Sequence, residues 1–163
     1  SPDTISLHYT LNFLKKKKIE NVIIEASSHG LHQERLHHID FKSAVFTNFS
    51  QDHLDYHKNM KAYLNAKLIL FRKILRKKTK IISDKDILPF KILKKISKKR
   101  GLKLVDINNE YLKVKNQLPT FPDFKKKNLA MAILAAKLCG LKDDLIYGEI
   151  KKINASHLVH SFV

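Results

Sequence analysis

One Asn, two Asp and two His fall within residues 47–57, directly after the apolar run Ala44–Phe46. An apolar run that ends in polar residues predicts a buried strand with its functional groups at the carboxyl end. In an open α/β sheet, ligands bind at that edge. The spacing therefore makes residues 47–57 the first candidate for a functional site.

The side chains of this segment suggest a metal ion. Carboxylate and amide oxygens together with an imidazole suit a hard divalent cation that keeps some water. Zinc is the alternative, because His53 and His57 lie close together, but zinc sites more often include cysteines or a helical His-x-x-x-His pair. We expect His57 to be a satisfied core or surface histidine, and His53 to be the better ligand candidate.

A second polar group follows the β-branched run Val22–Ile24, which predicts a short buried parallel strand. Glu25 ends that run, and a buried acid is costly unless it is paired or bound to a cation. Two serines, a histidine and a glycine come next, followed by Gln33 and Arg35. These residues could equally well be loop and helix-capping groups.

The rest of the chain must position these two groups, and it alternates predicted helices and strands. We expect a first helix that starts at Ser1-Pro2-Asp3, with Ser1 as its cap, and ends in the Lys15–Lys18 run. Further helices are predicted at residues 60–75, 87–99, 128–139 and 145–153, and further strands at 80–82, 102–105 and 111–114. This order predicts an α/β fold, with a mostly parallel sheet and helices on both faces.

Composition limits the functional class. The chain has 163 residues and 44% hydrophobic residues, which suits one domain with a real core. No apolar run approaches the length of a membrane span. The single cysteine, Cys139, fits a reducing cytoplasm, so we expect a cytoplasmic protein that does not bind membranes.

The net charge of +17 could indicate a nucleic-acid partner. The cations are mostly Lys, however, whereas base and phosphate recognition favours the bidentate Arg side chain. They also occur in separate runs, such as Lys15–Lys18 and Lys125–Lys127. Solvated faces are therefore the preferred interpretation, and nucleic acid is the disfavoured one.

Three segments, residues 25–35, 47–57 and 63–71, together resemble the Mur ligases, the ATP-dependent amide-bond-forming enzymes of peptidoglycan synthesis. Their order and spacing agree with the family, and the resemblance is strongest to the members that add the third residue of the stem peptide. It implies the central ATPase domain of such a ligase, with ATP and Mg²⁺ as cofactors. The implied substrates are UDP-MurNAc-dipeptide and an amino acid, either lysine or meso-diaminopimelate, and the implied state is a monomer.

The resemblance also implies a set of metal ligands. Glu25 would bind one magnesium ion, and His53 would bind a second. Lys67 would be the carbamylated lysine of the family, whose added carboxylate helps to hold the second ion. Asn48 and Asp52 would support the metal and phosphate region.

Substrate residues carry over in the same way. Ser27, Gln33 and Arg35 would bind the UDP-MurNAc-dipeptide, with Ser1 at the edge of that site. Asn128, at the start of the Ala-rich helix, would lie near the adenine.

The sequence also departs from the family. We assign residues 1–154 to the central domain without its phosphate loop, and leave 155–163 as an unassigned tail; the uridine-binding and C-terminal domains are absent from the sequence. Residues 83–86 carry a Ser and a Lys where the family usually has an Asn and paired acids. We therefore expect little or no ligase activity from the chain alone. A basic RNA-binding module, a zinc hydrolase on Asp52, His53 and His57, and a folate polyglutamate ligase are the alternatives.

Overall fold

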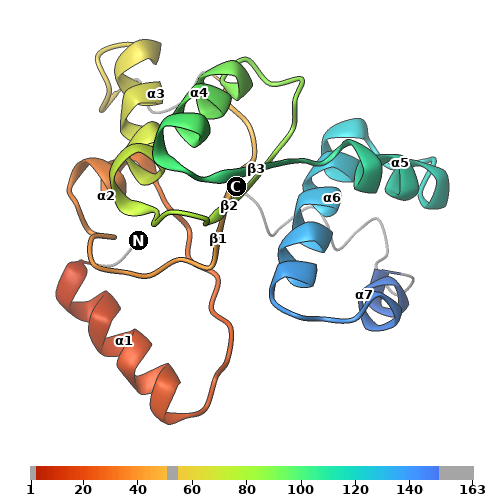
Figure 1. Cartoon of the computed structure of the whole chain (residues 1–163), viewed down its shortest axis with the longest axis horizontal. Coiled ribbons are helices and arrows are strands. Elements are labelled where there is room, and N and C mark those ends of the chain that lie inside the picture. The colour runs from red at the N-terminus through yellow and green to blue at the C-terminus, as the bar shows by residue number, and fades with distance from the viewer. Residues whose placement is uncertain (1–2, 51–54, 151–163) are drawn as a thin grey trace.

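A computed structural model of the chain describes residues 3–50 and 55–150 (Figure 1). The elements in chain order are α1 (Thr4–Lys16), α2 (Ser28–His32), β1 (Ser43–Phe46), α3 (Met60–Ile69), the π-helix η1 (Leu70–Ile74), β2 (Lys80–Ser83), α4 (Phe90–Arg100), β3 (Lys103–Asp106), α5 (Asn108–Gln117), α6 (Asp123–Leu138) and α7 (Asp143–Ile150). None of the described helices is both long and apolar enough to cross a membrane.

The three strands form one parallel sheet in the order β1-β2-β3. Phe46, Ser83 and Asp106 occupy the same register position at the carboxyl ends of the strands. The predicted parallel sheet and three of its strands are thus confirmed. Residues that follow these strands emerge at a common edge, which we call the carboxyl edge.

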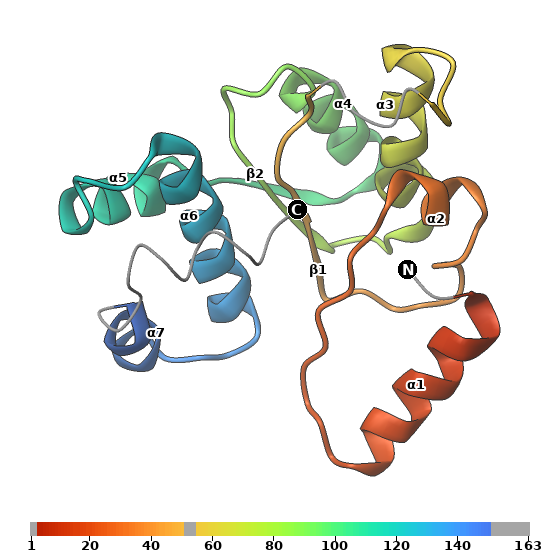
Figure 2. The same cartoon turned by 180° about the vertical axis from the view of Figure 1, so that it is seen from behind.

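Helices cover both faces of the sheet, as the sequence predicted (Figures 1 and 2). Successive residues of a strand point to opposite faces. Ile81 is fully buried in a core that includes residues of α1 to α4, and Ile82 is fully buried in a second core with α5, α6 and α7. The sheet therefore separates two hydrophobic cores.

The helices predicted at 60–75 and 87–99 are also confirmed, with the first continuing into η1. Gly101 ends α4 in the left-handed conformation, with φ of 66°, as expected of a glycine that follows a helix. The helix predicted at 145–153 corresponds to α7 as far as Ile150, and its last residues lie outside the described part of the chain.

The predicted start of the first helix is wrong, because Asp3 is its N-cap rather than Ser1. The Asp3 carboxylate accepts hydrogen bonds from the backbone N–H of Ser6, at 3.0 Å, and from its hydroxyl, at 2.6 Å. These bonds, led by the one from the hydroxyl, lower the pKa of Asp3. A carboxylate that accepts hydrogen bonds from both groups of Ser6 is a stronger cap than a serine hydroxyl.

The buried strand predicted at Val22–Ile24 is wrong as well. This segment is neither helix nor strand, and the side chain of Ile23 is 98% exposed. Its β-branched residues favour a strand, but a strand also needs a neighbour with which to pair. Within the described residues no strand pairs with this segment, and it lines a pocket together with α1.

The short strand predicted at 111–114 is instead part of helix α5. Tyr111, Val114 and Leu118 pack against the core below the second face of the sheet. Their spacing of three and four residues is helical, so the period of burial outweighed the β propensity of the individual residues.

Candidate functional site

Lys67 lies beside the carboxyl end of β1. Its half-buried side chain places Nζ 5.8 Å from the ring centroid of Phe46, the last residue of β1, and 5.3 Å from that of Tyr63. Tyr63 precedes Lys67 by one helical turn of α3, so both residues face the same way. The structure thus places Lys67 at the carboxyl edge.

The residues just after β1 are held against α3. The ring of Phe49 stacks on Tyr63, with centroids 5.2 Å apart. Asn48, which lies between Phe46 and Phe49, is exposed. The chain therefore presents Asn48 to solvent between two anchored rings, while Asp52 and His53 lie outside the described residues.

The three predicted substrate residues Ser27, Gln33 and Arg35 surround one short helix, α2. Ser27 is its N-cap and accepts a hydrogen bond of 3.1 Å from the backbone N–H of Gly30. Gln33 is exposed at the other end of the helix, and Arg35 is half-buried just beyond it. The Ser27 hydroxyl still has a proton to donate, so capping and substrate binding are compatible. Ser1 lies outside the described residues.

His57 connects α2 to α3. It is 5% exposed, its Nε2 lies 2.9 Å from the hydroxyl of Ser28, and its ring stacks on Tyr63 at 5.4 Å. This confirms the prediction of a satisfied core or surface histidine, and the structure places it in the core. His57 contacts Ser28 of α2 and Tyr63 of α3. It therefore joins the helix of the substrate candidates to the helix that carries Lys67.

Glu25 does not occupy the predicted position at the end of a buried strand. Its side chain is exposed, and it borders a pocket of about 340 Å³ between α1 and residues 22–25. The cost of burying an acid, which had argued for a bound cation, is therefore not incurred in this structure.

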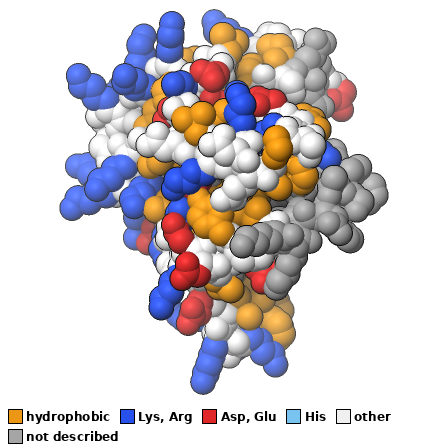
Figure 3. Space-filling model, turned by 90° about the vertical axis from the view of Figure 1, so that its right-hand side faces the viewer, with side chains coloured by type: hydrophobic (Ala, Val, Ile, Leu, Met, Phe, Trp, Pro, Cys, Tyr) orange, Lys and Arg blue, Asp and Glu red, His pale blue; other side chains and the backbone are white. Residues whose placement is uncertain are grey.

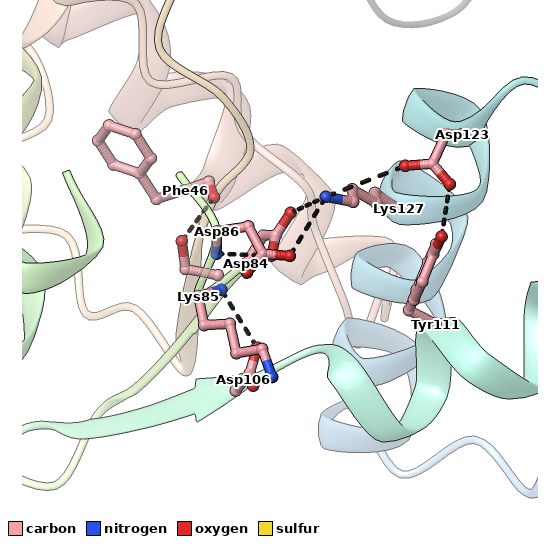
Figure 4. Close-up of polar contacts among 9 residues, drawn as sticks. Phe46, Asp84, Lys85, Asp86, Asp106, Tyr111, Asp123 and Lys127 are labelled. Carbon is pink, nitrogen blue, oxygen red and sulfur yellow. Dashed lines mark hydrogen bonds and ion pairs between the residues drawn. The ribbon is translucent and has the colours of Figure 1, made fainter. Parts of the chain in front are cut away.

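A cluster of charges lies at the carboxyl edge, after β2 (Figure 4). The Lys127 ammonium contacts Asp84 at 2.7 Å, Asp86 at 3.7 Å and Asp123 at 4.0 Å. Asp84 is only 4% exposed, so its charge needs this partner. The hydrogen bond to Asp84 is the main cause that raises the pKa of Lys127.

Two further contacts join the strand ends. The hydroxyl of Ser83, which is fully buried, donates to the carbonyl of Phe46 at 3.1 Å. The backbone N–H of Lys85 donates to the carboxylate of Asp106 at 3.2 Å. Ser83 and the backbone of Lys85, where the sequence departs from the family pattern, thus connect the three strands at this edge (Figure 4).

Sequence reasoning missed the role of Lys127, because it interpreted Lys125–Lys127 as a solvated run. That interpretation is wrong for two of the three residues. Lys126 is buried and donates to the carbonyl of Pro119 at 2.8 Å, and Lys127 pairs with Asp84. The available signal was an acid directly after a buried strand, which requires a cation from elsewhere in the chain.

Asn128 follows Lys127 in helix α6, which packs against β1 and β2. The helix begins at Asp123, so the prediction that Asn128 opens it is wrong. Asn128 is half-buried, and the ion pair of its neighbour with Asp84 anchors this part of α6 to the carboxyl edge.

Residues 1–130 of the chain match the family model for the Mur ligase middle domain. The chain belongs to the Mur ligase family. The match includes β1, β2 and β3, the candidate residues of α2 and α3, and the start of α6 with Asn128. The resemblance noted in the sequence is thereby confirmed for the family and for its α/β fold.

Three relatives of this Mur ligase domain carry the name UDP-N-acetylmuramoyl-L-alanyl-D-glutamate–2,6-diaminopimelate ligase. The protein from Aquifex aeolicus is 34% identical over 99% of the chain and 38% of its own length. Those from Wigglesworthia glossinidia brevipalpis and Buchnera aphidicola are 51% and 45% identical, over 53% and 65% of the chain and 17% and 21% of their own lengths. The chain thus spans less than half the length of these relatives.

Proposed function

We propose that this Mur ligase domain is the central part of a ligase that joins 2,6-diaminopimelate to UDP-MurNAc-L-Ala-D-Glu at the expense of ATP. The names of the relatives support the substrate pair, with lysine as the other candidate amino acid. The observation that carries the proposal is the position of Lys67, half-buried on α3 beside the last residue of β1. The reaction belongs to the whole ligase, of which we assign residues 1–154 to the central ATPase domain. Residues 155–163 stay unassigned.

In the proposed reaction, the substrate's D-Glu carboxylate attacks the γ-phosphorus of ATP, which forms an acyl phosphate and releases ADP. The amine of diaminopimelate then attacks the acyl carbon, passes through a tetrahedral intermediate and expels phosphate. Both steps develop charge on phosphate oxygens, and bound Mg²⁺ would neutralise it.

Glu25, His53 and carbamylated Lys67 would hold the magnesium ions. The donor chemistry of the described residues fits, because a carboxylate at Glu25 and a carbamate at Lys67 are hard oxygen ligands of the kind Mg²⁺ prefers. The Asp84 carboxylate is engaged by Lys127, so we assign it a structural role. Asn48 and Asp52 would support the metal and phosphate region.

The remaining roles are those that the family resemblance implies for residues around α2 and on α6. Arg35 suits a carboxylate or phosphate of the UDP-MurNAc-dipeptide, since its guanidinium can form bidentate bonds. Ser27 and Gln33 would bind the same substrate from the two ends of α2, with Ser1 nearby. Asn128 would lie near the adenine, held there by the anchored turn of α6.

A chimera that joins this chain to the other parts of a ligase would test the proposed function. The chain would replace the region that it matches in the Aquifex aeolicus ligase, and ADP release would be measured with UDP-MurNAc-dipeptide, ATP, Mg²⁺ and either diaminopimelate or lysine. We expect ligation of diaminopimelate, and a loss of at least about 100-fold in kcat for Lys67→Ala. Lys61→Ala is the matched control, because Lys61 is an exposed lysine on the same helix. A folded chimera that stays inactive beside an active parent enzyme would contradict the proposal.

The carbamate can be tested separately on the chain itself. We expect a carbamate carbon signal in ¹³C NMR spectra recorded with ¹³C-bicarbonate, and expect it to disappear in Lys67→Ala but not in Lys61→Ala. A spectrum that is the same for all three proteins would remove the carbamate from the proposed site.

A further inference from the structure

The opposite edge of the sheet carries a different charge. β2 begins with Lys80 and β3 with Lys103, and these two residues are direct partners in the parallel register. The same strands end next to Asp84 and at Asp106. The edge where the strands begin is therefore positively charged.

Two further segments bring more cations to this edge. The turn before β2 contains Lys77 and Lys78, and the backbone N–H of Lys78 donates to the carbonyl of Gly101 at 2.7 Å. That bond joins the turn to the end of α4, where Lys98 and Lys99 are exposed. We call residues 72–80 and 98–103 together the basic edge; every charged residue in these two ranges is Lys or Arg.

Few acids balance these charges. Residues 56–83 and 87–105 contain no Asp or Glu at all. Among the described residues, the one ion pair at the basic edge joins Arg76 to Asp40 at 2.8 Å, and both of its side chains are largely exposed. A surface with so little local neutralisation attracts polyanions.

The chemistry of the edge favours a phosphate backbone over a membrane. The described residues of the basic edge include no large exposed hydrophobic side chain, whereas Leu112, Phe124 and Leu145 are exposed on the elements α5 to α7. The space-filling view of the side of the molecule where α5 to α7 lie shows hydrophobic side chains among the charged ones (Figure 3). Binding in a membrane interface uses apolar anchors, and stacking on bases uses exposed aromatic rings. The basic edge offers the charged groups of Lys and Arg without exposed apolar anchors or aromatic rings.

We propose that the basic edge binds nucleic acid through its phosphate backbone and without sequence preference. The sequence argued against this partner because the cations are mostly Lys and fall in runs that were expected to be solvated. The fold brings the runs of residues 76–80 and 98–103 together, on the edge opposite the proposed ligase site. The inference is thus independent of the proposed ligase function.

Two variants of equal charge test this surface. One replaces Lys77, Lys78, Lys98 and Lys99 with Gln, and the other replaces Lys15, Lys16, Lys17 and Lys18 with Gln at the end of α1. All eight lysines are exposed, and Lys78 and Lys18 share a positive φ, so the two sets are closely matched. Circular dichroism would check that both variants unfold at the temperature of the parent chain.

Binding would be measured by fluorescence anisotropy with a labelled DNA duplex of random sequence, over a range of salt concentrations. If most of the four lysines contact phosphates, the edge variant should bind on the order of 10-fold or more weakly at low salt, and its log Kd against log salt should be about 3 units shallower. The α1 variant should change far less. Equal losses in both variants, no binding by the parent chain at low salt, or edge-dependent binding to anionic lipid vesicles but not to DNA would each overturn the proposal.

Discussion

The carboxyl edge and the basic edge of the same small sheet are built from charges in opposite ways. At the carboxyl edge, Asp84 is nearly inaccessible to solvent and a lysine from α6 contacts it directly. At the basic edge, cations such as Lys98 and Lys99 are exposed and have few acids near them. Buried charges need partners to persist, whereas exposed charges remain available to ligands. Charge at the first edge therefore supports the fold, and charge at the second is available for binding.

The largest effect is expected at the carboxyl edge. Lys127→Met would leave the Asp84 carboxylate buried without its cation, and should lower the free energy of unfolding by about 2 to 3 kcal/mol. Urea denaturation measures this change. Lys115→Met is the control, since it removes the same charge from an exposed position on α5. A Lys127 variant as stable as the Lys115 variant would show that the carboxyl edge does not depend on its ion pair.

A smaller loss is expected for Arg100, a cation of the basic edge that bonds to two backbone carbonyls. The Arg100 guanidinium donates to the carbonyls of Leu75, at 2.7 Å, and of Arg72 near the end of η1. Arg100→Met should cost about 1 to 2 kcal/mol of unfolding free energy, because these carbonyls lose their donor. The comparison is Lys99→Met in the same denaturation assay. Equal stability of the two variants would show that Arg100, like an exposed surface lysine, does not stabilise the fold.

Alkaline pH should remove the stability that Lys127 contributes at the carboxyl edge. The pKa of Lys127 is raised in the folded state, so its contribution is complete below the ordinary lysine value of about 10.4 and is lost as the pH rises through the folded-state pKa. Burial raises the pKa of Tyr147 and a hydrogen bond to Asp123 raises that of Tyr111, with the same sign of effect on stability. Stability should therefore fall above about pH 10, and fall less steeply in Lys127→Met than in Lys115→Met. Parallel curves would argue against the raised pKa of Lys127.

The smallest effect on stability is expected from the exposed lysines of the basic edge. Replacing Lys98 and Lys99 together with Gln should change the free energy of unfolding by less than about 0.5 kcal/mol, because neither side chain is buried. Thermal unfolding followed by circular dichroism checks this. A substantial loss would mean that the basic edge also supports the fold, and the contrast between the edges would disappear.

Local pattern was enough to predict much of the fold. The apolar runs at residues 44–46, 80–82 and 102–105 became parallel strands, because short β-branched runs between helical segments have few other ways to be buried. His57 was predicted to be a satisfied core or surface histidine, and it is buried and bonded to Ser28.

The incorrect predictions share a physical cause. Val22–Ile24 has the composition of a strand, but whether such a run is buried depends on neighbours that it cannot specify. Glu25 was misplaced for the same reason. The run Lys125–Lys127 gave no sign that two of its members would be engaged, since the acid that pairs with Lys127 lies after β2, far away in the chain.

The sequence by itself identified the family, through the resemblance of three segments. It also determined the parallel strands and the edge at which the ligase chemistry is proposed, because these depend on local order and composition. Only the tertiary structure decided which charges are buried and paired and which are gathered on a surface. Asp84 meets Lys127, and the turn before β2 meets the end of α4, across long stretches of chain. Coulombic contacts and burial depend on distance in space, so the opposite character of the two edges emerges only in the folded protein.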